Sequence, residues 1–285
     1  MKLGKETLSL FKRDLFLGFS SVRFRWITSM SLFVIILIVS FYQLKGLGEI
    51  EGIDSSTLTY TDLLFNVFRG KEYPTPDDLN FKFPFLWLII QLMGPFIIGG
   101  YVRDDLFDQS SFLFVRAKQR LSIWMSKLFF AIAVVISMYL IMAIITFLFS
   151  IFFLSVSPGW SEYGMKMIKP LIATDITPFV FSIHLFLLPF FITLLIVVVQ
   201  AIFTVFMRPI YAFIIMLSML VVSVFTTSRL VPGSYSMILR HHSLDSEYGF
   251  TWTMVIIYII AILLIVVCSG YFLFKKMDIF PKERD

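Results

Sequence analysis

Charged residues and cysteines are scarce in this chain. Charged residues make up 15% of its 285 residues, against about 25% in soluble domains. The single cysteine, Cys268, excludes an intrachain disulfide, and no Cys or His cluster has the spacing of a structural zinc site. These shortages argue against a disulfide-stapled or zinc-stabilised fold and against an ordinary soluble domain.

Apolar residues take the place of the missing charge. The chain is 58% hydrophobic, contains 34 Phe and has a mean hydropathy of +0.88. We therefore expect an all-α integral membrane protein that forms a single transmembrane domain over residues 1–285. Six apolar runs each reach the roughly 20 residues that a 30 Å hydrocarbon core requires. They are residues 26–44, 83–102, 128–154, 178–207, 209–228 and about 250–274.

Residues 1–25 are basic and amphipathic. An apolar stripe follows helical i+3/i+4 spacing, with Lys5, Lys12, Arg13 and Arg23 mostly off it. It consists of Leu8, Phe11, Leu15, Phe19, Val22 and Trp26. This pattern predicts a helix lying in the cytoplasmic membrane interface. A cleaved signal peptide is the alternative, but the apolar run at 26–44 is longer than a signal core and no A-x-A-like site follows it, which favours an uncleaved first span.

The distribution of Lys and Arg predicts the orientation. If the N-terminus is inside, residues 1–25, 102–127, 207–209 and 275–285 are cytoplasmic and carry 16 of the 24 Lys and Arg. The opposite loops, 45–82, 155–177 and 229–249, carry the other 8. We therefore expect both termini in the cytoplasm. This topology also explains the basic balance without nucleic acid as a partner.

The loops carry three further expectations. The segment at 101–127 mixes charges with apolar residues, which is typical of an amphipathic helix at the membrane surface or in a partner's groove. A short helix is expected near 60–68, and the apolar part of 229–249 is expected to fold back toward the bilayer. Asp104-Asp105 is interpreted as a helix stop and as the N-cap of the next helix.

This order of elements resembles the permease subunits of ABC-2 type transporters, which have the type V exporter architecture. The elements are a basic amphipathic N-terminal helix, six spans, a charged segment between spans two and three, and a short turn between spans four and five. The most specific local match is Asp104-Asp105, Ser110-Ser111, the run from Phe112 to Arg116, Arg120 and Lys127. Ser-Ser stands here for the family's common Gly-Thr, and Phe for some of its Leu.

The resemblance implies a permease subunit without its own ATPase, in agreement with the absence of a G-x-x-x-x-G-K-[ST] motif from the sequence. Residues 105–116 would be a coupling helix in a groove of a separate ABC ATP-binding subunit, expected in two copies, which holds ATP and Mg. The residues implied in ATPase coupling are Asp104, Asp105, Asp108, Phe112, Phe114, Arg116, Arg120 and Lys127.

The same resemblance implies a second permease subunit, either an identical copy or a paralogue. It also implies export of a hydrophobic or amphipathic substrate, such as a peptide, a lipid-linked molecule or a drug, across the plasma membrane of a bacterial cell. On this interpretation the chain is no enzyme, has no cofactor, metal or catalytic residue of its own, and contacts membrane lipid.

Two other classes were weighed. An intramembrane serine enzyme would need a G-x-S-x motif with a histidine on a neighbouring span, and His184 has no evident partner in the sequence. A metalloprotease would need H-E-x-x-H and a CAAX-type protease would need glutamates within spans, and the sequence contains neither. A secondary carrier would need charges within spans for ion coupling, and few are present. Among isolated polar residues, His241-His242 is a weak metal candidate, His184 is expected to be a hydrogen-bonded polar residue near the outer interface, and Gln91 and Gln200 are expected to hydrogen-bond between helices.

Overall fold

The computed structural model describes residues 2–74, 81–108, 117, 119–155, 157, 159–172 and 176–277. Helices dominate these residues, and no β-strand is found among them. Five helices in this part of the chain are long and apolar enough to cross a membrane. Exposed apolar side chains such as Phe16, Ile50 and Phe152, which are 75–80% accessible, cover the outer faces of two of the helices. The prediction of an all-helical chain with several apolar helices of span length is confirmed, and these helices favour association with a membrane.

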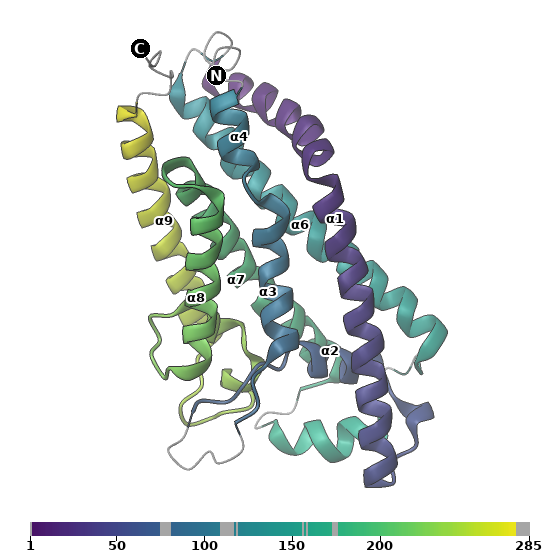
Figure 1. Cartoon of the computed structure of the whole chain (residues 1–285). Helices are drawn as coiled ribbons and strands as arrows, with labels where there is room; N and C mark the ends of the chain where they lie inside the picture. Colours follow the sequence, from purple (N-terminus) through teal and green to yellow (C-terminus); the bar gives the residue numbers. More distant parts are fainter. Residues whose placement is uncertain are drawn as a thin grey trace.

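The first helix, α1 (Lys2–Glu51), differs from the prediction. Residues 1–25 and 26–44 were expected to form two elements, but α1 is one helix of 50 residues, about 75 Å long at 1.5 Å per residue. Its first part runs obliquely across one end of the bundle before turning down its side (Figure 1). The helix continues because the buried stripe runs on through Val22, Trp26, Phe33 and Leu37 with no proline between them.

The second predicted span is two helices, α3 (Phe85–Ile98) and α4 (Tyr101–Asp108), separated at Gly99. Gly99 has φ +46°, and a Cβ at this position would collide with the Arg25 guanidinium of α1. Gly94 in α3 faces Thr193 and Val197 so closely that a Cβ there would lie under 3 Å from both side chains. Gly99 therefore permits the break between the two helices, and Gly94 permits close packing of α3 against α7.

The interpretation of Asp104-Asp105 as a helix stop and N-cap is wrong. Both residues lie inside α4, which ends at Asp108. The helix continues because Asp105 is buried among cationic side chains instead of facing water, while Asp104 remains on the exposed face.

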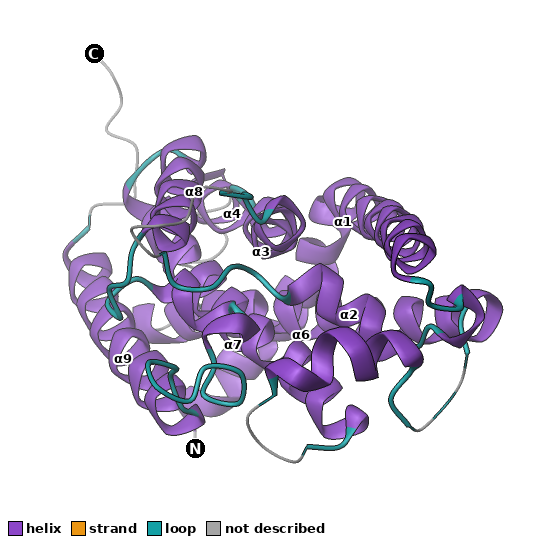
Figure 2. Cartoon of the chain, turned by 90° about the horizontal axis from the view of Figure 1, so that it is seen from below, coloured by secondary structure: helices purple, strands orange, loops and turns teal. Residues whose placement is uncertain are grey.

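The remaining long helices are α6 (Arg120–Phe153), α7 (Pro178–Phe206), α8 (Pro209–Phe225) and α9 (Trp252–Lys276). Six of the eight limits of these helices lie within two residues of the prediction, but α6 begins eight residues before 128 and α8 ends three residues before 228. α7 is central. In its most apolar 18-residue stretch 72% of the residues are buried, against 17% in the corresponding stretch of α9. Figure 2 shows α6 and α7 between α1 on one side and α9 on the other. α8 has 17 residues, about 26 Å, so it is not among the five span-length helices.

The other end of the bundle carries the short elements. They are η1 (Ser55–Thr57), α2 (Tyr60–Phe68), η2 (Gly164–Ile168), η3 (Lys169–Leu171), η4 (Pro232–Ser236) and η5 (Ile238–Arg240). α2 has the predicted limits, and the Thr59 backbone N–H caps it by donating to the Asp62 carboxylate at 2.7 Å. All residues of η4 are buried, and η4 packs against α7 and α8. The 229–249 loop therefore folds back against the bundle, while its predicted approach to the bilayer stays a prediction.

The segments predicted to share one side of the membrane do lie together. The start of α1, α4, the start of α6, the α7–α8 turn and the end of α9 are at one end of the bundle, and the elements of the three opposite loops are at the other (Figure 1). We call the first the N-terminal end and the second the loop end.

Candidate functional site

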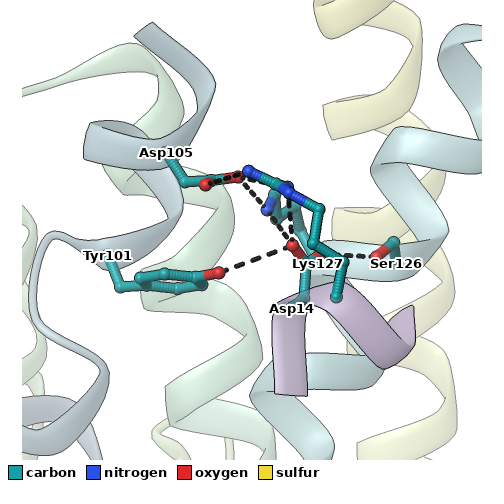
Figure 3. Close-up of polar contacts among 6 residues, drawn as sticks. Asp14, Tyr101, Asp105, Ser126 and Lys127 are labelled. Atoms are coloured by element: carbon teal, nitrogen blue, oxygen red, sulfur yellow. Dashed lines mark hydrogen bonds and ion pairs between the residues drawn. The ribbon is translucent and has the colours of Figure 1, made fainter. Parts of the chain in front are cut away.

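Three helices bring charged side chains together at the N-terminal end, where the view of Figure 3 is centred. α1 supplies an adjacent Arg-Asp pair, α4 supplies two residues one helical turn apart, and α6 supplies an adjacent Ser-Lys pair. Residues at i and i+4 share a helix face, so both α4 side chains point into the same space. We call this group the ion cluster: Arg13, Asp14, Tyr101, Asp105, Ser126 and Lys127.

The two carboxylates of the ion cluster are bridged by two cations. The Arg13 guanidinium forms a bidentate hydrogen-bonded ion pair with the Asp105 carboxylate, with Nη2–Oδ1 at 2.7 Å and Nη1–Oδ2 at 3.1 Å. The Lys127 ammonium lies 2.7 Å from Asp14 Oδ1 and also donates to Asp105 Oδ2. Ser126 and Tyr101 hydroxyls donate to Asp14. Each carboxylate is therefore satisfied by several donors from other helices.

Burial makes this pairing necessary. The exposed fractions of the Asp14, Lys127 and Asp105 side chains are 1%, 3% and 4%, and that of Arg13 is 18%. A buried charge without a partner is costly, whereas the two cations and two carboxylates together carry no formal net charge. The ion cluster therefore holds α1, α4 and α6 in one relative position. Separating α4 or α6 would leave an uncompensated charge, and separating α1 would remove a counterion from both Asp105 and Lys127.

Two arginines connect the same region to the C-terminal ends of other helices. The last carbonyls of a helix lack intrahelical donors and carry partial negative charge, which favours a cation there. Arg103 of α4 donates to the carbonyls that end α7, namely those of Thr204, Val205 and Met207 at 3.3–3.5 Å. Arg120, the first residue of α6, donates to those that end α9, namely Phe274, Lys275 and Met277 at 2.7–3.3 Å.

The candidate coupling residues separate into three groups. Asp105 and Lys127 meet in the ion cluster, and Arg120 binds the end of α9. Asp104 and Asp108 lie on the exposed face of α4 and are not part of the cluster. Phe112, Phe114 and Arg116 lie outside the described residues.

Asp14, Tyr101 and Ser126 were not predicted as site residues, and Arg13 was predicted only to lie off the apolar stripe of the N-terminal helix. A signal for Asp14 was present, since it lies four residues before Gly18 and eight before Val22, both buried on the inward face of α1. An acid in line with that stripe must find a cation or a proton. Which lysine pairs with Asp14 depends on how α1 crosses α6, and no local sequence pattern encodes that crossing.

Polar residues deeper in the bundle connect α3 and α7. Thr193 donates to the Gln91 side chain at 2.8 Å, and Gln200 donates to the Pro95 carbonyl at 3.0 Å, which confirms the predicted inter-helix hydrogen bonding. At the loop end, His184 lies beside His241 with ring centroids 5.7 Å apart. Within the described ranges, no three His, Cys, Asp or Glu side chains are grouped as metal ligands.

A family model described as "Protein of unknown function (DUF2705)" matches residues 63–280. This match covers about three quarters of the chain. The chain belongs to the DUF2705 family. The DUF2705 match includes Asp105, Lys127 and both helix-capping arginines, and it begins after α1. No curated protein and no solved structure matches the chain.

Proposed function

We propose that this chain is the membrane-spanning permease subunit of an ATP-driven ABC exporter of the ABC-2 type. A separate ATP-binding subunit would hydrolyse ATP, and residues 105–116 would receive the resulting motion. A second permease subunit, identical or paralogous, would complete the path for a hydrophobic or amphipathic cargo. In this proposal α8 is the sixth span, and the N-terminal end of the bundle faces the cytoplasm.

The observation that carries the proposal is the set of contacts on either side of the segment at 109–118. Asp105 precedes this segment and Lys127 follows it, and the two side chains form an ion pair. Arg103 and Arg120 lie just outside the same segment and bind the ends of α7 and α9. A segment flanked in this way is anchored at both sides to five helices of the bundle.

This arrangement supports a mechanism for coupling. A push on the segment would displace α4 and the start of α6 together, because the Asp105–Lys127 pair resists their separation. Asp14 and Arg13 would carry α1 along, and the two arginines would transmit the displacement to the ends of α7 and α9. The helices would then move as a connected unit relative to a second permease subunit, instead of each deforming alone.

The test is association with an ATP-binding subunit through Phe112 and Phe114. Replacing both with aspartate should abolish co-purification of the ATPase and export, because charged side chains cannot enter an apolar groove without losing hydration. Membrane insertion should persist, since the segment lies between spans. Co-purification from native membranes measures association with the ATPase, and immunoblotting of the membrane fraction measures insertion.

The matched control is Gln109→Asp with Ser111→Asp, which adds the same charge to the same segment and keeps both aromatic side chains. This control should retain the ATPase. Undiminished association and export in the Phe112→Asp/Phe114→Asp variant would refute the coupling role.

A further inference from the structure

A cavity of about 560 Å³ lies at the loop end of the bundle, at the opposite end from the ion cluster. α1, α2 and the start of α3 contribute to its walls, together with the chain at 69–73 and 82–84. This volume is in the range of sites that hold small organic ligands. Nothing in the coupling mechanism above uses it.

Three basic residues form what we call the basic wall of the cavity. They are Arg69, Lys71 and Lys82, and among the described lining residues Glu72 is the one acid. Lys71 also lies over the Phe81 ring, with its ammonium 3.7 Å from the ring centroid. Guanidinium and ammonium groups in a partly enclosed space attract anions.

The remaining lining is largely apolar. Phe83, Phe85 and Trp87 line the cavity where α3 begins, and 65% of Phe85 is exposed. The Trp87 indole N–H donates to Ser236 at 3.0 Å, which fixes the ring against η4. A basic wall beside aromatic rings is suited to a molecule that carries an anionic group on an apolar body.

The basic wall is held in place by a fully buried arginine. Arg240 donates to the Lys71 carbonyl at 2.9 Å and to the Glu72 carbonyl at 3.3 Å, and the Leu239 N–H donates to the Arg69 carbonyl at 3.2 Å. Arg240 also donates to the end of α8 through the carbonyls of Ser223 and Val224. The backbone that carries Arg69 and Lys71 is therefore fixed against the bundle before any ligand arrives, which reduces the entropy cost of binding.

We propose that this cavity binds the phosphate headgroup of an anionic membrane lipid, with Arg69, Lys71 and Lys82 around the phosphate and the first part of the tail on Phe83 and Phe85. Guanidinium and ammonium groups are the usual partners of phosphate. Basic sites beside membrane helices recognise acidic headgroups. The proposal is independent of whether the chain works with an ATPase.

Binding to the purified full chain in neutral detergent tests this. Short-chain phosphatidylglycerol, short-chain phosphatidylcholine and inorganic phosphate would be titrated separately, with bound lipid counted by native mass spectrometry and protein stability followed by thermal unfolding. Phosphatidylglycerol should bind at least tenfold more tightly than the other two, and added NaCl should weaken it because it screens the headgroup charge.

The variant Arg69→Gln/Lys71→Gln should lose at least tenfold in affinity for phosphatidylglycerol, and so should Lys82→Gln. Lys169→Gln removes an exposed charge at the same end of the bundle but outside the cavity, and it should bind as the unmodified chain does. Unchanged affinity in both cavity variants, or phosphatidylcholine binding as tightly as phosphatidylglycerol, would overturn the proposal. Inorganic phosphate binding as tightly as the lipid would also overturn it, because the tail would then contribute nothing.

Discussion

At the scale of single residues, Asp14 accepts from four side chains at once. Arg13, Lys127, Ser126 and Tyr101 all donate to its carboxylate. Such a group stabilises the fold only while every partner remains, because the desolvation cost of each ion is offset by the others. The exposed pair of Lys166 and Glu162, joined at 2.8 Å, is the opposite case, in which water solvates both ions with or without pairing.

We therefore expect Lys127→Met to lower the free energy of unfolding by roughly 3–5 kcal/mol, because it leaves two buried carboxylates with one cation. Combining it with Asp105→Asn should recover part of this loss, since Arg13 and Asp14 then remain as a neutral pair. Denaturant titration in detergent measures both. Lys166→Met is the control and should cost at most about 1 kcal/mol. Strictly additive effects of Lys127→Met and Asp105→Asn would contradict the shared cluster.

A second prediction at this scale concerns pH. Burial, helped by the neighbouring His184 and His242, lowers the pKa of His241 to about 4. The unfolded chain takes up this proton near pH 6.5, while the folded protein resists it until about pH 4. Stability from this group is therefore present above pH 6.5 and is lost as the pH falls toward 4, by on the order of 3 kcal/mol in total.

His241→Asn removes the titrating group and keeps an acceptor for the Ser243 N–H, which now donates to Nδ1 at 3.2 Å. Thermal unfolding between pH 7.5 and 4.5 should show a smaller loss of stability in this variant than in the unmodified chain. The difference between the two curves cancels the carboxyl groups that titrate in both. Parallel curves would show that His241 is not held neutral by the fold.

At the scale of elements, the junction of α3 and α4 shows how a glycine permits a polar contact. Gly99 leaves the helical conformation, and the Arg25 guanidinium of α1 occupies the space where a Cβ would be. The break lets α4 leave the direction of α3 and brings Tyr101 and Asp105 to the ion cluster. Without the break, α4 would continue along the axis of α3 (Figure 1).

Gly99→Ala should therefore destabilise the protein by roughly 1–3 kcal/mol, through strain at positive φ and displacement of Arg25. The matched control is Gly46→Ala in α1, where a Cβ meets nothing within 4 Å. That substitution should be neutral or stabilise by about 0.5–1 kcal/mol, because alanine favours a helix over glycine. Thermal unfolding of the two variants side by side measures the contrast, and equal effects would contradict the role given to Gly99.

At the scale of the whole molecule, the start of α1 and the end of α9 lie at the same end of the bundle (Figure 1). The helices that carry the ion cluster, α1, α4 and α6, meet at this end. The short helices and the basic cavity occupy the other end. The proposed orientation assigns the first end to the cytoplasm, where Lys and Arg are enriched.

Cysteine labelling tests this orientation. In a Cys268→Ser background, a membrane-impermeant maleimide should label Glu247→Cys in intact cells, because this exposed residue precedes α9 at the loop end. Asp108→Cys, exposed at the end of α4, should react only after permeabilisation. The reverse pattern would invert the topology and end the proposal that residues 105–116 meet a cytoplasmic ATPase.

Helix positions followed closely from the sequence wherever apolar runs end at proline or polar residues. The limits of α2, the start of α7 and a short turn before α8 were all expected. The prediction was wrong where charge alone was used to end a helix. α4 and the start of α6 both continue through charged residues, because Asp105 and Lys127 find partners that belong to distant parts of the chain.

The sequence by itself determined that this chain builds long apolar helices, where most of them lie, and which segments share one end, because hydropathy and charge act over a few turns of one helix. Only the tertiary structure decided which charges become buried and which groups each of them contacts. Asp14 meets Lys127, and Arg240 meets the backbone at 71–72, because helices far apart in sequence cross there. Those crossings depend on side-chain packing along whole helices, which no local pattern records.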